Sequence, residues 1–171
     1  AGYIADWHAG AIQATHGVEL VAVCDSSQSA AAALAETYGI APYTDLETML
    51  AAGICDAVHI VTPPQTHRAL AETCLNAGLH VLVEKPVALS GHDTRAIHDT
   101  ALANDRVFAA GHSFMGTPGY LRLKDAVETG RIGRIAAAEI NWHFPLAPLR
   151  SGPFGLWLLQ EPQNLLLELG P

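Results

Sequence analysis

The sequence has little of what disulfide frameworks, nucleic-acid surfaces and membrane spans require. Its three cysteines, Cys24, Cys55 and Cys74, are odd in number and lie in apolar segments. This favours reduced core thiols in a cytoplasmic protein. No apolar run approaches the roughly 18 residues that a membrane span needs. The chain also has no lysine or arginine cluster and carries a net charge of -8, so we expect neither a nucleic-acid partner nor a membrane partner.

The sequence does have apolar residues in quantity. Half of its 171 residues are hydrophobic and only 15% are charged, which is enough for a substantial core and excludes a disordered chain. The first residue is alanine instead of methionine. We therefore expect the sequence to be a piece of a longer protein.

Predicted strands and helices alternate along the first two thirds of the chain. Apolar runs predict strands at residues 20–25, 57–61, 81–84 and 107–110. Between them, helices are predicted at residues 29–38, 44–53, 66–76 and 90–104, the second opened by a capping box of Thr44 and Glu47. This alternation is typical of an α/β protein with a doubly wound parallel sheet.

The pattern changes after Gly111. Thr117 and Pro118 predict the start of a helix that ends near Gly130. Residues 136–144 then alternate apolar and polar side chains, as in an antiparallel strand with one wet face, and residues 145–153 predict an irregular loop. We therefore expect a nucleotide-binding domain at residues 1–112. Residues 113–171 would begin an α+β domain with an open antiparallel sheet.

A short apolar run ends abruptly at Glu84, Lys85 and Pro86. In open parallel sheets the ligand crevice lies just outside the carboxyl ends of the strands. Lys85 is therefore placed for chemistry. The alternative is that Lys85 only carries a charge into solvent where Pro86 stops the strand.

The first five residues match the end of the dinucleotide fingerprint G-x-G-x-x-[GA]. Gly2 would let a pyrophosphate approach the start of a helix, and the small Ala5 would let that helix pack on a strand. The first glycine and its strand would precede Ala1. Asp25 stands 23 positions after Gly2, where an acid accepts hydrogen bonds from the adenine ribose. No arginine follows it to hold a 2'-phosphate, so NAD is favoured over NADP. Alternatively, the glycine belongs to an ordinary tight turn and Asp25 caps the next helix.

With these features and the series Thr62-Pro63-Pro64-x-x-His67, the chain resembles the Gfo/Idh/MocA oxidoreductases, the family of glucose-fructose oxidoreductase and inositol dehydrogenase. The resemblance implies a Rossmann domain, NAD as cofactor, a homo-oligomer, and hydride transfer between a sugar or cyclitol and nicotinamide. It implies that Lys85 contacts the reacting hydroxyl and that the peptide bond before Pro86 is cis. The cofactor-binding residues that we expect are Gly2, Tyr3, Ile4, Asp25, Thr62, Pro63, Pro64, His67, Glu84, Lys85 and Pro86.

Oxidising a secondary alcohol also requires a group that removes the hydroxyl proton. The resemblance implies an Asp-x-x-x-His motif on a helix of the second domain. Here Glu168 stands at the aspartate position, and the histidine would follow directly after Pro171. Glu168 and Lys85 are the catalytic residues that the sequence predicts.

The nine histidines do not predict a metal site. They form no i, i+4 pair and none lies beside a cysteine pair. His67 is expected to shape the nicotinamide end of the crevice, whereas His8 is interpreted as a packed helix residue.

Three functions fit these observations. Lys85, Asp25 and the glycine turn together favour an NAD-dependent sugar or cyclitol dehydrogenase. The resemblance leaves open a nucleotide-sensing regulator without catalysis and a glycosidase that retains its NAD. Net NADH formation would distinguish the dehydrogenase from both.

Overall fold

In a computed structural model, the chain forms two compact units, residues 1–110 and residues 111–171. The structure describes residues 1–141, 143 and 156–169, without the side chains of residues 158, 165, 166, 168 and 169. Among the described residues, no helix has both the length and the apolar character that crossing a membrane requires.

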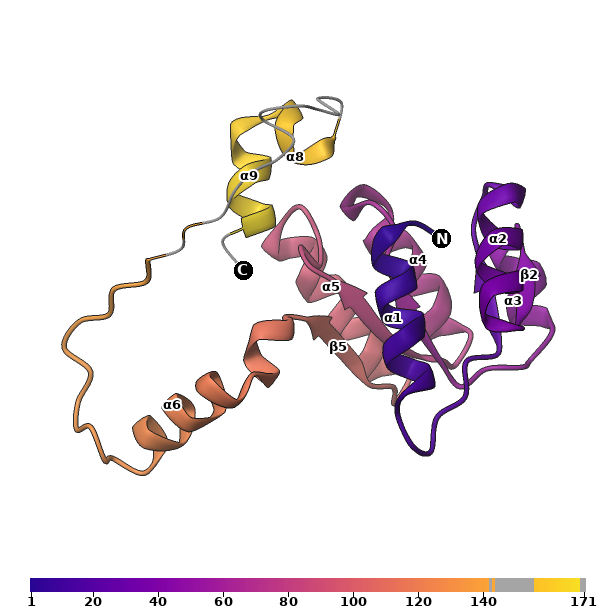
Figure 1. Cartoon of the computed structure of the whole chain (residues 1–171). Helices are drawn as coiled ribbons and strands as arrows, with labels where there is room; N and C mark the ends of the chain where they lie inside the picture. The colour runs from indigo at the N-terminus through magenta and orange to yellow at the C-terminus, as the bar shows by residue number, and fades with distance from the viewer. Residues whose placement is uncertain (142, 144–155, 170–171) are drawn as a thin grey trace. The chain divides into compact units, whose positions relative to one another are not determined.

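The first unit alternates helices and strands, as the sequence predicts (Figure 1). Its helices are α1 (Tyr3–Gln13), α2 (Gln28–Tyr38), α3 (Leu46–Ala51), α4 (Pro64–Asn76) and α5 (Gly91–Ala103). Its strands are β1 (Ala22–Cys24), β2 (Ala41–Tyr43), β3 (Ala57–Ile60), β4 (His80–Glu84) and β5 (Phe108–Gly111). Every predicted strand of this region is present, and β2 is an additional one.

The strands form two sheets instead of the single sheet that we expected. β1 pairs with β2 in parallel, and a separate sheet has the order β3-β4-β5, in which β3 and β4 are parallel. No backbone hydrogen bonds join β1 to β3, so the described strands form two separate sheets.

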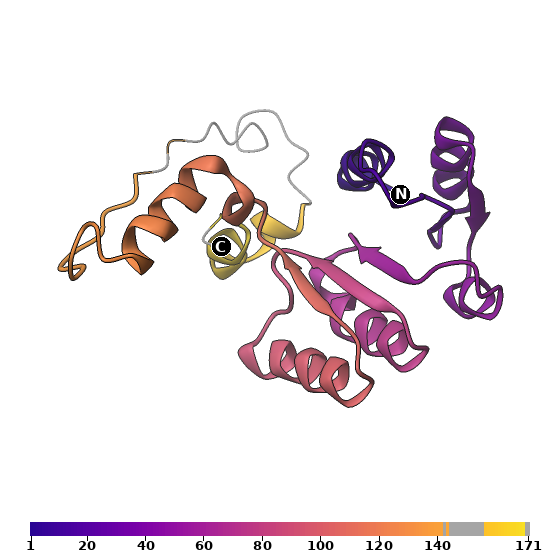
Figure 2. The same cartoon turned by 90° about the horizontal axis from the view of Figure 1, so that it is seen from below.

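The main core lies between the second sheet and the helices α4 and α5, which cover one of its faces (Figure 2). Val81 and Val83 of β4 point into this core and are almost fully buried. Because side chains alternate along a strand, Leu82 and Glu84 belong to the opposite face. The core cluster comprises Ile60, Ala71, Cys74, Leu75, Val81, Val83, Val87, Ile97 and Ala101.

Small polar side chains begin three of the helices. Ser27 caps α2, and Ser90 caps α5 by accepting the N–H of Asp93 at 3.0 Å. The capping residue of α3 is Asp45, which accepts the N–H of Thr48 at 2.7 Å. The predicted capping box at Thr44 is therefore wrong by one residue, because the Asp45 carboxylate meets the free N–H groups of the first turn instead.

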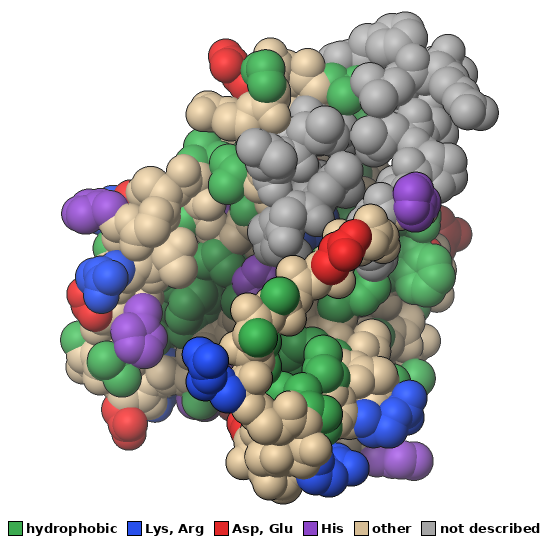
Figure 3. All heavy atoms as spheres, turned by 90° about the vertical axis from the view of Figure 1, so that its left-hand side faces the viewer, with side chains coloured by type: hydrophobic (Ala, Val, Ile, Leu, Met, Phe, Trp, Pro, Cys, Tyr) green, Lys and Arg blue, Asp and Glu red, His purple; other side chains and the backbone are tan. Residues whose placement is uncertain are grey.

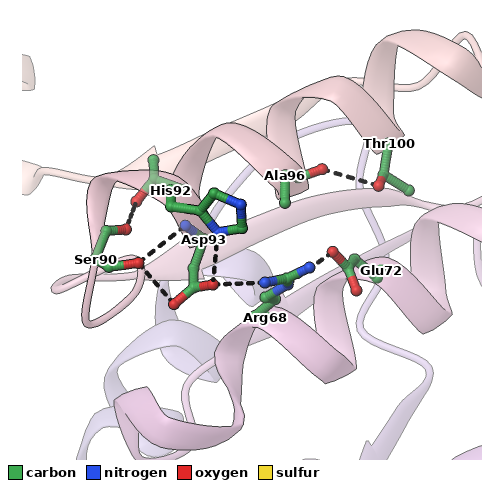
Figure 4. A network of polar contacts seen from close by, with 8 residues as sticks. Arg68, Glu72, Ser90, His92, Asp93, Ala96 and Thr100 are labelled. Atoms are coloured by element: carbon green, nitrogen blue, oxygen red, sulfur yellow. Dashed lines mark hydrogen bonds and ion pairs between the residues drawn. The ribbon is translucent and has the colours of Figure 1, made fainter.

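A polar network on the surface joins α4 to the start of α5 (Figure 4). The Arg68 guanidinium donates to Glu72 at 3.0 Å within α4 and to Asp93 at 2.6 Å on α5. The Ser90 hydroxyl also donates to Asp93, at 2.8 Å. Hydrogen bonds lower the pKa of Asp93, and the largest effects come from Ser90 and then from Arg68. The network links the two helices at the surface, beside the apolar contacts that pack them together.

The second unit contains the 3₁₀ helix η1 (Ser113–Gly116) and the helices α6 (Pro118–Glu128), α8 (Trp157–Gln160) and α9 (Pro162–Leu169). As predicted, Thr117 caps α6, and Pro118 is its first residue. Apolar side chains reach the surface on the face drawn in Figure 3. Exposed large apolar residues of this unit include Leu121, Leu123, Ile132, Ile135 and Ile140.

The predicted strand at residues 136–144 is wrong for the part that is described. Residues 136–141 and 143 adopt no strand, and Ile140 is 88% exposed. An alternating pattern alone does not stabilise a strand, because its N–H and C=O groups need a neighbouring strand, and no described segment pairs with this one. The loop predicted at residues 145–153 lies outside the described residues.

Candidate active site

Predicted site residues directly follow the strands of the first unit. Asp25 comes immediately after β1, Thr62 lies two residues after β3, and Lys85 comes immediately after β4. Ligands of open parallel sheets bind outside these carboxyl ends. The fold therefore places the three predicted motifs where a ligand crevice would be.

The glycine turn leads into α1 without a capping side chain. Gly2 is the capping residue of α1, with an extended backbone at φ -95° and ψ -167°. A Cβ atom added there would meet nothing within 4 Å. The helix N-terminus carries a partial positive charge and N–H groups that can bind an anion. Tyr3 and Ile4 form the first turn of α1.

The Asp25 carboxylate lies beside the glycine turn. It contacts the amino group of Ala1 and accepts the N–H of Ser27 at 2.8 Å. Because Ser27 caps α2, Asp25 is not the helix cap that was its alternative role.

His67 joins the turn after β3 to the segment after β4. Its ring Nε2 lies 2.7 Å from the carbonyl oxygen of Thr62, and its Nδ1 lies 3.0 Å from that of Pro86 and 3.2 Å from that of Val87. The ring is almost fully buried. His67 therefore lies between the two loops, and because a neutral imidazole carries one N–H, it can donate to the carbonyl groups of one loop at a time. Pro63 and Pro64 start α4 just ahead of it.

Glu84, Lys85 and Pro86 form the end of β4 and the first residues beyond it. The Lys85–Pro86 peptide bond is cis, as the family resemblance implied. One oxygen of Glu84, Oε2, accepts the N–H of Lys85 at 2.9 Å. Burial alone would raise the pKa of Glu84, but hydrogen bonds from His8 and from the Lys85 N–H, together with their charges, lower it. Glu84 is therefore a carboxylate at neutral pH.

His8 is a site residue that the sequence interpretation missed. Its Nε2 lies 3.0 Å from Glu84 Oε1, and its Nδ1 lies 2.9 Å from Nδ1 of His59 on β3. The side chains of His8 and Glu84 are only 19% and 18% exposed. A signal was present, because Ile4 and His8 share one face of α1 at helical spacing, but nothing in the sequence showed which strand that face meets.

The predicted second-domain residues are only partly visible. Glu168 belongs to α9, but its side chain lies outside the description, as do Gly170 and Pro171. Across the described part of the chain, no group of three or more His, Cys, Asp or Glu side chains could hold a metal ion.

An α/β unit with an open glycine turn, an acid after β1 and a lysine after β4 has the features of a dinucleotide-binding protein. Residues 1–112 match the family model described as "Oxidoreductase family, NAD-binding Rossmann fold", named GFO_IDH_MocA. The chain belongs to this family, which confirms the resemblance drawn from its motifs.

Among curated proteins, the chain is similar to 1,5-anhydro-D-fructose reductase of Ensifer adhaerens, with 33% identity over 92% of the chain and 46% of the relative. It is also similar to inositol 2-dehydrogenase of Rhizobium meliloti (strain 1021), with 33% identity over 86% of the chain and 44% of the relative. The chain thus spans less than half the length of these relatives.

A solved structure has the same arrangement. The WlbA dehydrogenase of Bordetella pertussis, in complex with NADH and UDP-GlcNAcA, matches with a TM-score of 0.72 and 32% identity, over 78% of this chain and 42% of that one. This match extends the family assignment from sequence to backbone structure.

Proposed function

We propose that this chain belongs to an NAD-dependent oxidoreductase that transfers a hydride between a hydroxyl-bearing carbon of a sugar or cyclitol and nicotinamide. The observation that carries the proposal is the position of Lys85. It lies directly after β4, with its N–H bound to Glu84 and the following carbonyl bound to His67. A lysine that only carried charge into solvent would not need such support.

The residues present fit a dinucleotide. The uncapped N-terminus of α1 at Gly2, Tyr3 and Ile4 would face the pyrophosphate, and the Asp25 carboxylate would accept hydrogen bonds from the adenine ribose. A negative charge at Asp25 repels a 2'-phosphate, which supports NAD over NADP. Thr62, Pro63 and Pro64 would border the nicotinamide end. His67 acts there through the loops it joins, because its own ring is buried.

Bound NAD would supply the hydride acceptor, and the chain would supply orientation and charge. The Lys85 ammonium would donate a hydrogen bond to the substrate hydroxyl and hold its carbon toward the cofactor. As the hydride leaves, the hydroxyl loses its proton to a base. The sequence predicts Glu168 as the acid that takes part in this proton transfer.

The relatives support a small polyol substrate. The names of two relatives refer to anhydrofructose and inositol. A third relative is D-glucoside 3-dehydrogenase of Escherichia coli (strain K12). We extend this substrate class to the present chain, together with a cytoplasmic location, which the free thiols support, and a homo-oligomeric state.

The test is turnover by the complete protein that contains this chain. The protein is mixed with NAD and a panel of sugars and cyclitols, and NADH formation is followed by absorbance. We expect net NADH with at least one member of the panel. Tight NAD binding without NADH would instead indicate a nucleotide sensor, and cleavage of a glycoside without net NADH would indicate a glycosidase that recycles its cofactor.

A further inference from the structure

Three side chains form a row on the face of the second sheet opposite α4 and α5. His59 of β3 contacts His8 of α1 through their Nδ1 atoms, 2.9 Å apart, and His8 contacts Glu84 of β4 through Nε2, 3.0 Å from Oε1. The two rings meet edge to face, with centroids 5.1 Å apart and an angle of 89°. Three separate elements of the fold are therefore joined at one point.

The charge on Glu84 determines which ring nitrogen donates in each of these hydrogen bonds. An ionised Glu84 can only accept hydrogen bonds, so Nε2 of His8 carries the proton that points at it. In a neutral His8 the lone pair then lies on Nδ1, and Nδ1 of His59 is the donor to it. Partial burial lowers the pKa of His59 and a charge on His8 would lower it further, while the Glu84 carboxylate raises it. With both rings neutral, these contacts hold each ring in one tautomer.

Both oxygens of Glu84 are used in this arrangement. Oε1 accepts from His8, and Oε2 accepts the backbone N–H of Lys85 at 2.9 Å. On the far side of Lys85, the carbonyl of Pro86 is bound to His67. The backbone that carries Lys85 is therefore held on one side by the His8–Glu84 pair and on the other by His67.

We propose that His8 is a positioning residue, which fixes the Glu84 carboxylate and through it the backbone of Lys85, so that the lysine is aimed at the reacting hydroxyl. This inference rests on the proposed function. His59 supports it by holding His8 in the tautomer that donates to Glu84. His8 itself touches no reacting atom in this scheme.

Two substitutions of His8 separate positioning from simple packing. His8→Leu fills similar space but cannot donate to Glu84, whereas the amide nitrogen of His8→Gln reaches about as far as Nε2 and can donate. The matched control is His98→Leu, at an exposed position of α5. All variants are made in the complete protein, and kcat, KM for NAD and thermal unfolding are measured for each.

We expect His8→Leu to lower kcat by about 10- to 100-fold, the range usual for lost supporting contacts at a site, with less than about threefold change in KM for NAD. His8→Gln should recover most of the loss, and His98→Leu should match the wild type. Wild-type kcat in His8→Leu, or no recovery in His8→Gln, would overturn the proposal.

A second measurement keeps the test independent of turnover. Hydrogen exchange of the peptide that covers residues 80–89 should be faster in His8→Leu and normal in His8→Gln, because only the former releases the carboxylate that holds the Lys85 N–H. If the wild type forms no NADH with any substrate, the proposed function fails, and exchange alone decides the role of His8. Unchanged exchange in His8→Leu would then refute it.

Discussion

The charge of Asp25 should decide between the two nicotinamide cofactors. Replacing it with alanine removes the carboxylate that we place beside the adenine ribose. The change should leave α2 intact, because Ser27 and not Asp25 caps that helix. What is lost within the protein is one hydrogen bond from the N–H of Ser27, a bond whose net worth is about 0.5 to 1.5 kcal/mol.

The size of the cofactor effect follows from the exposure of this side chain. Two unit charges about 4 Å apart interact by about 1 kcal/mol in water and by about 4 kcal/mol near a protein surface with an effective dielectric constant of about 20. The Asp25 side chain is 25% exposed, which places it between these limits. We therefore expect the wild type to prefer NAD over NADP by about 1 to 3 kcal/mol, or about 5- to 150-fold.

The assay is a binding titration of both cofactors against the complete protein and two variants. Asp25→Ala should narrow the preference by at least about fivefold. Asp25→Asn can still accept the N–H of Ser27 but has no charge. It should narrow the preference as much, while keeping more of the affinity for NAD. A ratio of NAD to NADP affinity that stays the same in both variants would show that the carboxylate does not face the ribose.

Three further outcomes test the site and the core. Lys85→Ala should lower kcat by about 100-fold or more with little change in NAD affinity, and near-normal turnover would contradict its catalytic role. Ile97 is fully buried, so Ile97→Ala should lower the free energy of unfolding in urea by about 2 to 5 kcal/mol. Leu102 lies on the same helix and is 66% exposed, so Leu102→Ala should change this free energy by less than about 0.5 kcal/mol. The lowered pKa of Glu84 means that the ionised carboxylate stabilises the fold above its usual pKa of 4.5 and that this stability is lost as the pH falls through the lower, folded-state value. Glu84→Gln should therefore lose less stability than the wild type on acidification, which denaturant titrations below pH 4.5 would detect.

Local sequence determined most of the elements of the first unit. Buried parallel strands require continuous apolar runs, and the runs before Asp25, Thr62 and Lys85 are strands in the structure. Ser90 begins a helix because its hydroxyl reaches an N–H three residues away, a contact within one turn. The position of Lys85 at a strand end follows from the same local rules.

The sequence of a single segment did not predict which strands pair. β2 includes Pro42, which lacks an N–H and argues against a strand, yet it pairs in register with Val23 of β1 at the edge of a short sheet. Residues 136–141 show the opposite case, since their alternating pattern forms no strand without a partner. A strand forms only where a neighbouring segment supplies its backbone hydrogen bonds. The apolar and polar pattern of one segment carries no information about that neighbour.

The contacts that support the site were decided only by the tertiary structure. His8 and Glu84 are 76 positions apart, and they meet because the alternation of β4 turns Glu84 toward the face where α1 lies. The ring nitrogens of His67 lie within hydrogen-bond distance of carbonyl groups 5, 19 and 20 positions away, so its surroundings need both loops in place. The sequence identified the residues that could perform the chemistry because their motifs are continuous. The side chains that hold them converge from separate elements, and only the folded chain brings these together.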